Sequence, residues 1–195
     1  ITTSYNFRFT ESYYKGSSQR YNFFPNQSPF YLNTNDRGTS HNFANTINSS
    51  LDWNIKEKNS LSFSVLVSES NGSNKGKVRT DFLDSVVDFL SAYNRYNDTK
   101  NINWNTELNT SFRRTFKDNS NDLIIAANYG YSNRKSTPEY TQKTIDISNT
   151  ELNRTDLLQH NENTNLSHSG FVQADYTQPF KKSKSKLEIG YKFSL

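Results

Sequence analysis

The residues of this sequence that could bind a metal ion are few and scattered. Its three histidines, His41, His160 and His168, fall in loop-like or strand-start sequence and lack the spacing of a metal site. The sequence contains no cysteine, which excludes thiolate ligands and a disulfide scaffold. We therefore expect surface histidines, with no metal or cofactor.

A short acidic run is a second candidate for cation binding. Asp81, Asp84 and Asp88 lie close together in the sequence. The segment lacks the Asp/Asn-Gly loop that calcium sites normally contain. A solvated acidic patch is therefore the simpler interpretation.

Catalysis would require a nucleophile, an acid–base pair or a metal that a partner holds in place. No such constellation is visible in the sequence. Five charged residues lie on the polar face of expected strands, near the end with the short turns: Asp52, Glu107, Arg113, Asp175 and Glu188. In a barrel they would point into a hydrated lumen, where they would pair with each other or with a plug domain, or simply remain hydrated. A hydrated site does not adjust a carboxyl group for general-acid catalysis. We therefore expect no enzymatic activity.

The composition is polar but rich in aromatic residues. Only 32% of the residues are hydrophobic, and the mean hydropathy is −0.92. Aromatic residues nevertheless make up 14% of the sequence, whereas disordered segments contain few of them. No run of about 18 apolar residues is present, so a transmembrane helix is excluded. The net charge is +4, with lysines gathered at turns, which gives nucleic-acid binding little support.

The clearest pattern is the alternation between Phe171 and Leu195. In 171–177, Val172, Ala174 and Tyr176 share one face, because successive side chains of a strand point to opposite sides. In 186–195, every odd-numbered residue is aliphatic or aromatic. Two adjacent strands of this kind are typical of a membrane barrel or of a half-exposed soluble sheet.

Other segments alternate in the same way: 1–14, 43–55, 60–68, 101–116 and 123–131. Between them, Asp81–Tyr96 is ambiguous. Phe82, Val86 and Phe89 have helical spacing, whereas the Val86-Val87 pair and the later aromatics favour a strand, which we prefer. We predict an all-β, antiparallel barrel segment of about seven strands.

Three polar stretches are expected to be loops: Lys15–Ser40, with a strand extension through Arg20–Phe24, then Asn71–Lys77 and Asn133–Asn161. The first contains five aromatics, which would form a ligand surface or pack against neighbouring loops: Tyr21, Phe23, Phe24, Phe30 and Tyr31.

Short lysine-bearing turns recur at 56–59, 117–121 and 181–185. A membrane-crossing strand needs only about 9–11 residues, so long segments remain at the end opposite these turns. Short periplasmic turns and long extracellular loops are the asymmetry of bacterial outer-membrane barrels.

The segment Gln173–Phe180, with its lysine-rich turn and Lys186–Lys192, resembles the outer-membrane β-barrel family within the TonB-dependent receptors of the Bacteroidetes type. The resemblance implies a plugged barrel of about 22 strands in the outer membrane of a Gram-negative bacterium. It further implies import of an unknown scarce ligand, driven by a TonB complex acting on the plug. Residues 1–195 would then be part of one barrel domain, with the plug and the remaining strands elsewhere.

The wall of such a barrel would contact the lipid of the outer membrane. Six aromatics near strand ends are expected to form girdles at the two membrane interfaces, although ordinary strand propensity also explains them: Trp53, Phe116, Tyr129, Tyr131, Tyr176 and Tyr191.

Two alternative protein classes remain open. A passive porin would share the wall pattern, and a soluble surface or adhesion domain would bury the face of Leu187, Ile189 and Phe193 against a second sheet.

Overall fold

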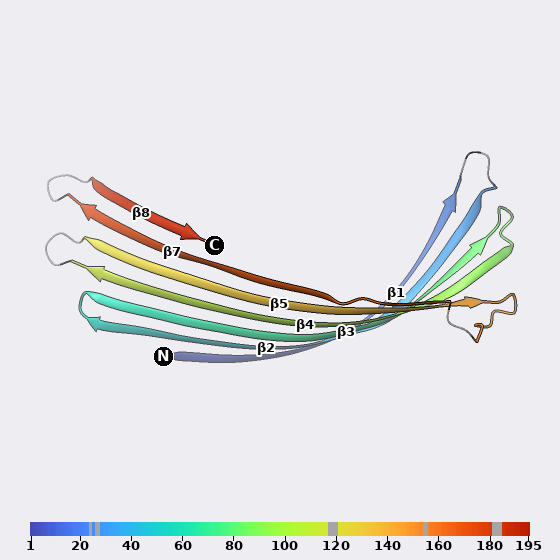
Figure 1. Cartoon of the computed structure of the whole chain (residues 1–195), viewed down its shortest axis with the longest axis horizontal. Coiled ribbons are helices and arrows are strands. Elements are labelled where there is room, and N and C mark those ends of the chain that lie inside the picture. The colour runs from blue at the N-terminus through green and yellow to red at the C-terminus, as the bar shows by residue number, and fades with distance from the viewer. Residues whose placement is uncertain (24, 26–27, 117–120, 154–155, 181–184) are drawn as a thin grey trace.

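The protein folds as one antiparallel sheet in a computed structural model, which describes residues 1–23, 25, 28–116, 121–153, 156–180 and 185–195 (Figure 1). Within these ranges there are eight strands: β1 (Thr2–Asn22), β2 (Phe30–Lys56), β3 (Asn59–Leu83), β4 (Phe89–Thr115), β5 (Asp122–Ile145), β6 (Leu157–His160), β7 (Asn163–Pro179) and β8 (Lys186–Ser194). They pair in the order β1-β2-β3-β4-β5-β7-β8, and the short β6 pairs with β5. The all-β, antiparallel prediction is confirmed.

The register of the sheet places residues that alternate in sequence on two faces. Ile189 of β8 lies opposite Tyr176 of β7, and Phe193 lies opposite Val172. Directly opposite residues of an antiparallel pair point to the same side of the sheet. The predicted alternation of the last hairpin therefore continues across the neighbouring strand.

The long loops of the sequence prediction are mostly wrong. Residues 15–22 and 30–40 are paired arms of β1 and β2, with Lys15 opposite Arg37. Residues 71–77 lie inside β3, and β5 continues to Ile145. These segments lack an apolar face because both of their faces contact water. They therefore carry no alternation, although the backbone ladder runs through them.

Residues 81–96 are the end of β3, a turn and the start of β4. In the turn, Oδ1 of Asp84 accepts hydrogen bonds from the backbone N–H groups of Val86 (2.9 Å) and Asp88 (2.8 Å). Val87 has a positive φ of 70°, which a hairpin turn requires and a helix does not allow. The preference for strands is confirmed.

The short turn at 56–59 joins β2 to β3, as predicted. The other two lysine turns lie largely outside the described residues, at 117–120 and 181–184. Their flanks close as hairpins: the N–H of Phe116 donates to the carbonyl of Asn121 (2.9 Å), and that of Phe180 to the carbonyl of Ser185 (3.1 Å). In Figure 1 these three hairpin ends lie together, opposite the ends of the β1–β2 and β3–β4 hairpins.

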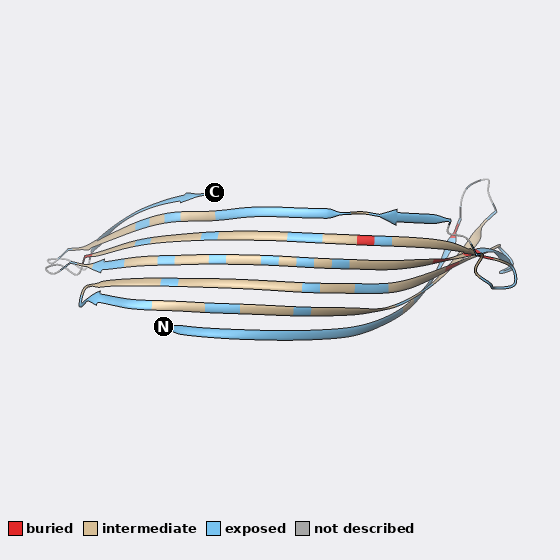
Figure 2. Ribbon diagram, turned by 60° about the horizontal axis from the view of Figure 1, so that its bottom comes forward, coloured by how far each residue is buried: buried red, intermediate tan, exposed pale blue. Residues whose placement is uncertain are grey.

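The described part of the sheet has almost no buried core. Among hydrophobic residues there, only Ala92 (2% exposed) and Ile145 (3%) are buried, and Figure 2 shows β1 exposed along nearly its whole length. Large apolar side chains such as Trp53 (55%) and Ile189 (60%) are open. No second sheet covers them within the described ranges, contrary to what the soluble-domain alternative requires. No helix in the same ranges is long and apolar enough to cross a bilayer.

Candidate functional site: the two faces of the sheet

One face of the sheet carries a continuous apolar band. The register puts its members on the same side: Phe9 faces Phe43, Leu61 lies between Trp53 and Phe112, and Ile125 continues the second row. The band occupies Leu61–Val67 of β3 and Ile102–Phe112 of β4, close to the 9–11 residues that cross a bilayer. An exposed apolar surface of this extent marks contact with lipid or with another protein.

Aromatic residues lie at one end of this band and within it. At the end with the short turns, the rings of Phe116 and Tyr176 meet edge to face, with centroids 6.5 Å apart. Further along β5, opposite Thr106 and Leu108 of β4, Tyr131 packs on His168 at 5.3 Å, and the Tyr129 hydroxyl is 2.8 Å from Nδ1 of His168. The position of Phe116 and Tyr176 suits the headgroup level of a membrane.

The opposite face is dominated by Ser, Asn and Thr, and it carries all five charged residues singled out from the sequence: Asp52, Glu107, Arg113, Asp175 and Glu188. The structure does not bring them together, because they are spread over β2, β4, β7 and β8. Most bond locally instead.

These local contacts join side chains that are close together on the sheet. Arg113 bonds Asp122 at 2.6 Å, and Lys186 bonds Glu188 at 2.6 Å. Gln173 donates to Asp175 at 2.7 Å, while Asn109 and Asn128 donate to Glu107. Asp52 lines a shallow hollow. No nucleophile–base pair arises among them.

The three histidines stay apart, each beside a different residue. His41 lies 3.7 Å from Glu11, and His160 lies 3.0 Å from Glu139. Throughout the described ranges, no three His, Asp or Glu residues form a group that could hold a metal ion.

The acidic run is also divided by the fold. Asp81 bonds Arg79 at 2.8 Å, and Asp84 closes the turn described above. It is a structural feature rather than a cation site.

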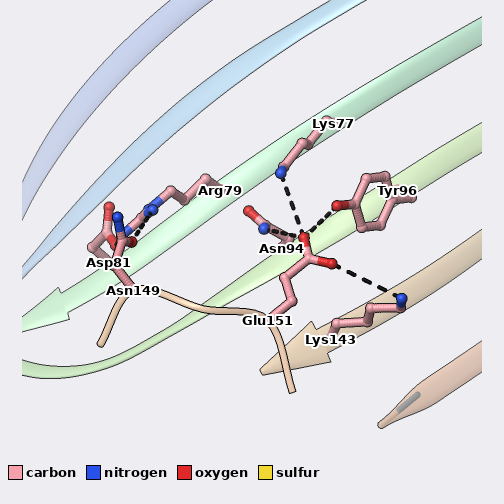
Figure 3. A network of polar contacts seen from close by, with 8 residues as sticks. All are labelled: Lys77, Arg79, Asp81, Asn94, Tyr96, Lys143, Asn149 and Glu151. Atoms are coloured by element: carbon pink, nitrogen blue, oxygen red, sulfur yellow. Dashed lines mark hydrogen bonds and ion pairs between the residues drawn. The ribbon is translucent and has the colours of Figure 1, made fainter. Parts of the chain in front are cut away.

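Beyond the apolar band, a network that the sequence did not reveal ties the segment after β5 to the sheet (Figure 3). The carboxylate of Glu151 accepts hydrogen bonds from Tyr96, from Asn94 (2.5 Å) and from Lys77 (3.4 Å). Lys143 adds an ion pair at 3.9 Å. Four donors from β3, β4 and β5 thus converge on one loop residue.

This network holds Glu151 in its charged form. The hydrogen bond from Tyr96 is the main cause that lowers the pKa of Glu151, with Asn94 and Lys77 adding to it and desolvation opposing it. Glu151 follows a turn in which Thr150 donates its N–H to Asp146 Oδ1 at 2.7 Å. No local pattern marks Glu151 in the sequence, because its partners come from three separate strands.

At the same end of the sheet, the polar face carries a group of aromatic residues and an arginine. The guanidinium of Arg95 lies 4.2 Å from the centre of the Tyr140 ring. Phe82 packs between Phe30 (6.2 Å) and Tyr93 (6.1 Å). We call Phe30, Phe82, Tyr93, Arg95 and Tyr140 the inner aromatic group.

The aromatics expected to line a ligand-binding loop are divided between the two faces. Phe30 belongs to the inner aromatic group. Tyr21 and Tyr31 contact each other on the other face, with tilted rings whose centroids are 4.9 Å apart, and Phe24 lies outside the described residues. The other members of the group were missed because they lie on β3, β4 and β5.

The alternating strands at the C-terminal end resemble a known family. Residues 114–195 match the model of the outer membrane protein beta-barrel family. No curated protein matches the chain. The match begins at the end of β4 and continues through β8, and it supports an outer-membrane β-barrel protein.

In an outer-membrane β-barrel, apolar and polar faces have fixed directions. In such a barrel the apolar band would face lipid and the alternate residues would face the interior, because a charged group costs about 2–4 kcal/mol at the bilayer midplane. The inner aromatic group would then be on the interior side, and the Glu151 network would be on the outward side beyond the membrane.

Proposed function

We propose that this sheet is the wall and outer mouth of a TonB-dependent receptor of the Bacteroidetes type, which imports a scarce ligand. The length of the strands carries the proposal: β2 and β4 have 27 residues each, whereas a membrane crossing needs about 9–11. The excess lies at the end opposite the short turns. It supports a tall mouth for ligand capture, which a passive pore does not need.

The open edges of the sheet support a larger barrel. In the described part of the chain, β1 pairs only with β2, and β8 pairs only with β7. Lipid does not tolerate unpaired strand edges, so further strands must complete the wall. A barrel of about 22 strands has a lumen that a plug domain fills, and the plug is the part on which a TonB complex would act.

The inner aromatic group supports ligand contact at the mouth. Neighbouring aromatic rings and an arginine offer flat apolar surfaces and directed hydrogen bonds without a reactive group. We therefore propose reversible binding of a siderophore, glycan or peptide, without chemical change of the ligand.

Uptake by cells that express the whole barrel tests this proposal. We expect accumulation of one labelled class among ferric siderophores, oligosaccharides and short peptides, and loss of that accumulation with a protonmotive-force uncoupler. Uptake that is linear in concentration and unaffected by the uncoupler would identify a passive porin. A ligand chemically altered by the purified protein would contradict the non-enzymatic role.

The inner face can be tested separately with Arg95→Ala combined with Tyr140→Ala. Both side chains lie on the interior side, so we expect weaker ligand binding to intact cells while the barrel still assembles. Thr141→Ala, next to Tyr140 on the outward face of β5, is the matched control. Equal effects of the two changes would place ligand contact elsewhere.

A further inference from the structure

A row of cations crosses the outward face beyond the apolar band. Arg37 of β2 lies directly opposite Lys15 of β1 and directly opposite Lys77 of β3. We propose that this row binds the phosphate groups of an anionic glycolipid in the outer leaflet. The proposal rests on the outward direction of this face and not on the transported ligand.

Arg37 has no acidic neighbour on its own face of the adjacent strands. Its direct neighbours are Lys15 and Lys77, and its diagonal neighbours on β3 are Lys75 and Arg79. Like charges directly opposite one another destabilise a sheet. Cations in register therefore favour a nearby anion that balances them.

Acidic partners compensate the cations of β3 but not the other two. Lys75 pairs with Asp98 (3.7 Å), Lys77 with Glu151 (3.4 Å) and Arg79 with Asp81 (2.8 Å). In the described part of the chain, Lys15 and Arg37 have no ion pair. Their charges remain available to a ligand.

The row borders a shallow hollow that could hold an anionic group. Its walls are formed by Lys15, Asn35, Arg37, Lys77 and Arg79, together with Gly16 and Asp36. Asp36 is the one acid among these lining residues, and its side chain lies on the other face, beside the position of a Cβ at Gly16. The planar guanidinium of Arg37 suits two parallel hydrogen bonds to a phosphate.

The height of the row selects a lipid with a large phosphorylated headgroup. Lys15 is six residues beyond Phe9 on the same face of β1, which is about 20 Å along a strand. With a strand tilt of about 40°, the row stands about 15 Å above the apolar band. Lys and Arg side chains extend downward over part of that distance, so a phosphorylated sugar headgroup fits better than a small phospholipid headgroup.

The test uses the purified whole barrel and three probes: bisphosphorylated lipid A, phosphatidylglycerol and inorganic phosphate. Lys15→Gln combined with Arg37→Gln should weaken lipid A binding about tenfold, because two charge-assisted contacts are lost. Arg20→Gln combined with Arg134→Gln removes the same charge from the interior face and should leave lipid A binding unchanged.

The comparison of probes decides the source of the phosphate. Saturable lipid A binding that inorganic phosphate does not displace supports the proposal, whereas displacement by millimolar phosphate would overturn the lipid assignment. Equal weakening by the interior control pair would also overturn it, since only net charge would then matter.

Two further observations keep the test independent of folding. Heat-modifiable migration on gels must be retained by each variant, and Arg37→Lys keeps the charge while removing the two-pronged donor. We expect a smaller loss of lipid A affinity with Arg37→Lys than with the double change. The proposal that the row binds lipid A would be contradicted if a folded Arg37→Lys variant lost all affinity while the variant with both Lys15→Gln and Arg37→Gln kept it.

Discussion

The side chain of Tyr14 lies directly over Gly38 on the neighbouring strand. A Cβ added at Gly38 would be 2.5 Å from the Tyr14 hydroxyl oxygen and 2.6 Å from Cζ of its ring. The same hydroxyl occupies the space above Gly76 on β3. Tyr14, Gly38 and Gly76 form one row across three strands of the interior face, so the tyrosine fills the gap that two missing side chains leave.

This relationship predicts that Gly76→Ala will destabilise the β1–β3 sheet by about 1–3 kcal/mol, because the new methyl group displaces Tyr14. Urea unfolding of the whole barrel measures the change. Gly72→Ala, on the same strand and face, is the control, since its Cβ would meet its nearest neighbour at 3.4 Å. Combined with Tyr14→Ala, Gly76→Ala should cost much less than alone; additive effects would show that the ring does not fill this space.

The facing of β8 predicts opposite responses at two adjacent positions. Ile189→Arg puts a charge in lipid and should cost roughly 2–4 kcal/mol, whereas Gly190→Arg points to the interior, where the Asp175 carboxylate lies beside position 190. Barrel assembly in cells, measured by heat-modifiable migration, should fail for Ile189→Arg alone. Equal tolerance of both changes would mean that the two faces are assigned in reverse.

The arrangement of hairpins predicts the topology. An epitope tag after Ser148, in the segment between β5 and β6, should be labelled on intact cells. A tag after Glu57, in the short turn between β2 and β3, should be labelled only after the outer membrane is permeabilised. Surface labelling at Glu57 would invert the orientation of the sheet.

The Glu151 network predicts a loop that is released by acid. Because the pKa of Glu151 is lowered below its ordinary value of 4.5, the contribution of the charged carboxylate to docking is complete above that value. It is lost as the pH falls through the lowered pKa. Hydrogen exchange of residues 146–153, corrected for intrinsic rates, should therefore rise as the pH is lowered below 4.5.

A Glu151→Gln variant should show fast exchange in the same segment already at neutral pH, because it loses the ion pairs with Lys77 and Lys143. Glu139→Gln, which removes an exposed contact with His160, serves as the matched control. Unchanged protection in Glu151→Gln would show that the backbone contacts of the segment, and not the carboxylate, hold it in place.

The membrane part of the fold could be predicted because it alternates. From Leu187 to Leu195 every second side chain meets lipid and must be apolar, so apolar and other residues alternate in the sequence. The same holds for the interior placement of Glu107 and Asp175. Above the membrane the constraint disappears, since water is on both sides, and the pairing of Lys15 with Arg37 leaves no periodic signal.

The polar contacts of the mouth were beyond prediction for a different reason. Glu151 meets Lys77 and Tyr96 across 74 and 55 positions of sequence, and Arg95 meets Tyr140 across two strands. Such contacts depend on register, which is set by the whole ladder and not by any local pattern. Without the register, each of these residues is indistinguishable from a solvated surface residue.

The paired arms of β1 to β5 would also change the thermodynamics of the proposed ligand binding. A flexible loop must lose conformational entropy when it closes on a ligand, at roughly 1–2 kcal/mol for each ordered residue. The backbone of a hydrogen-bonded ladder has already lost that freedom when the barrel folds. A mouth that extends about 50 Å along the strands would therefore present a rigid, preorganised surface to its ligand. Less of the favourable binding free energy would then be lost to ordering the backbone.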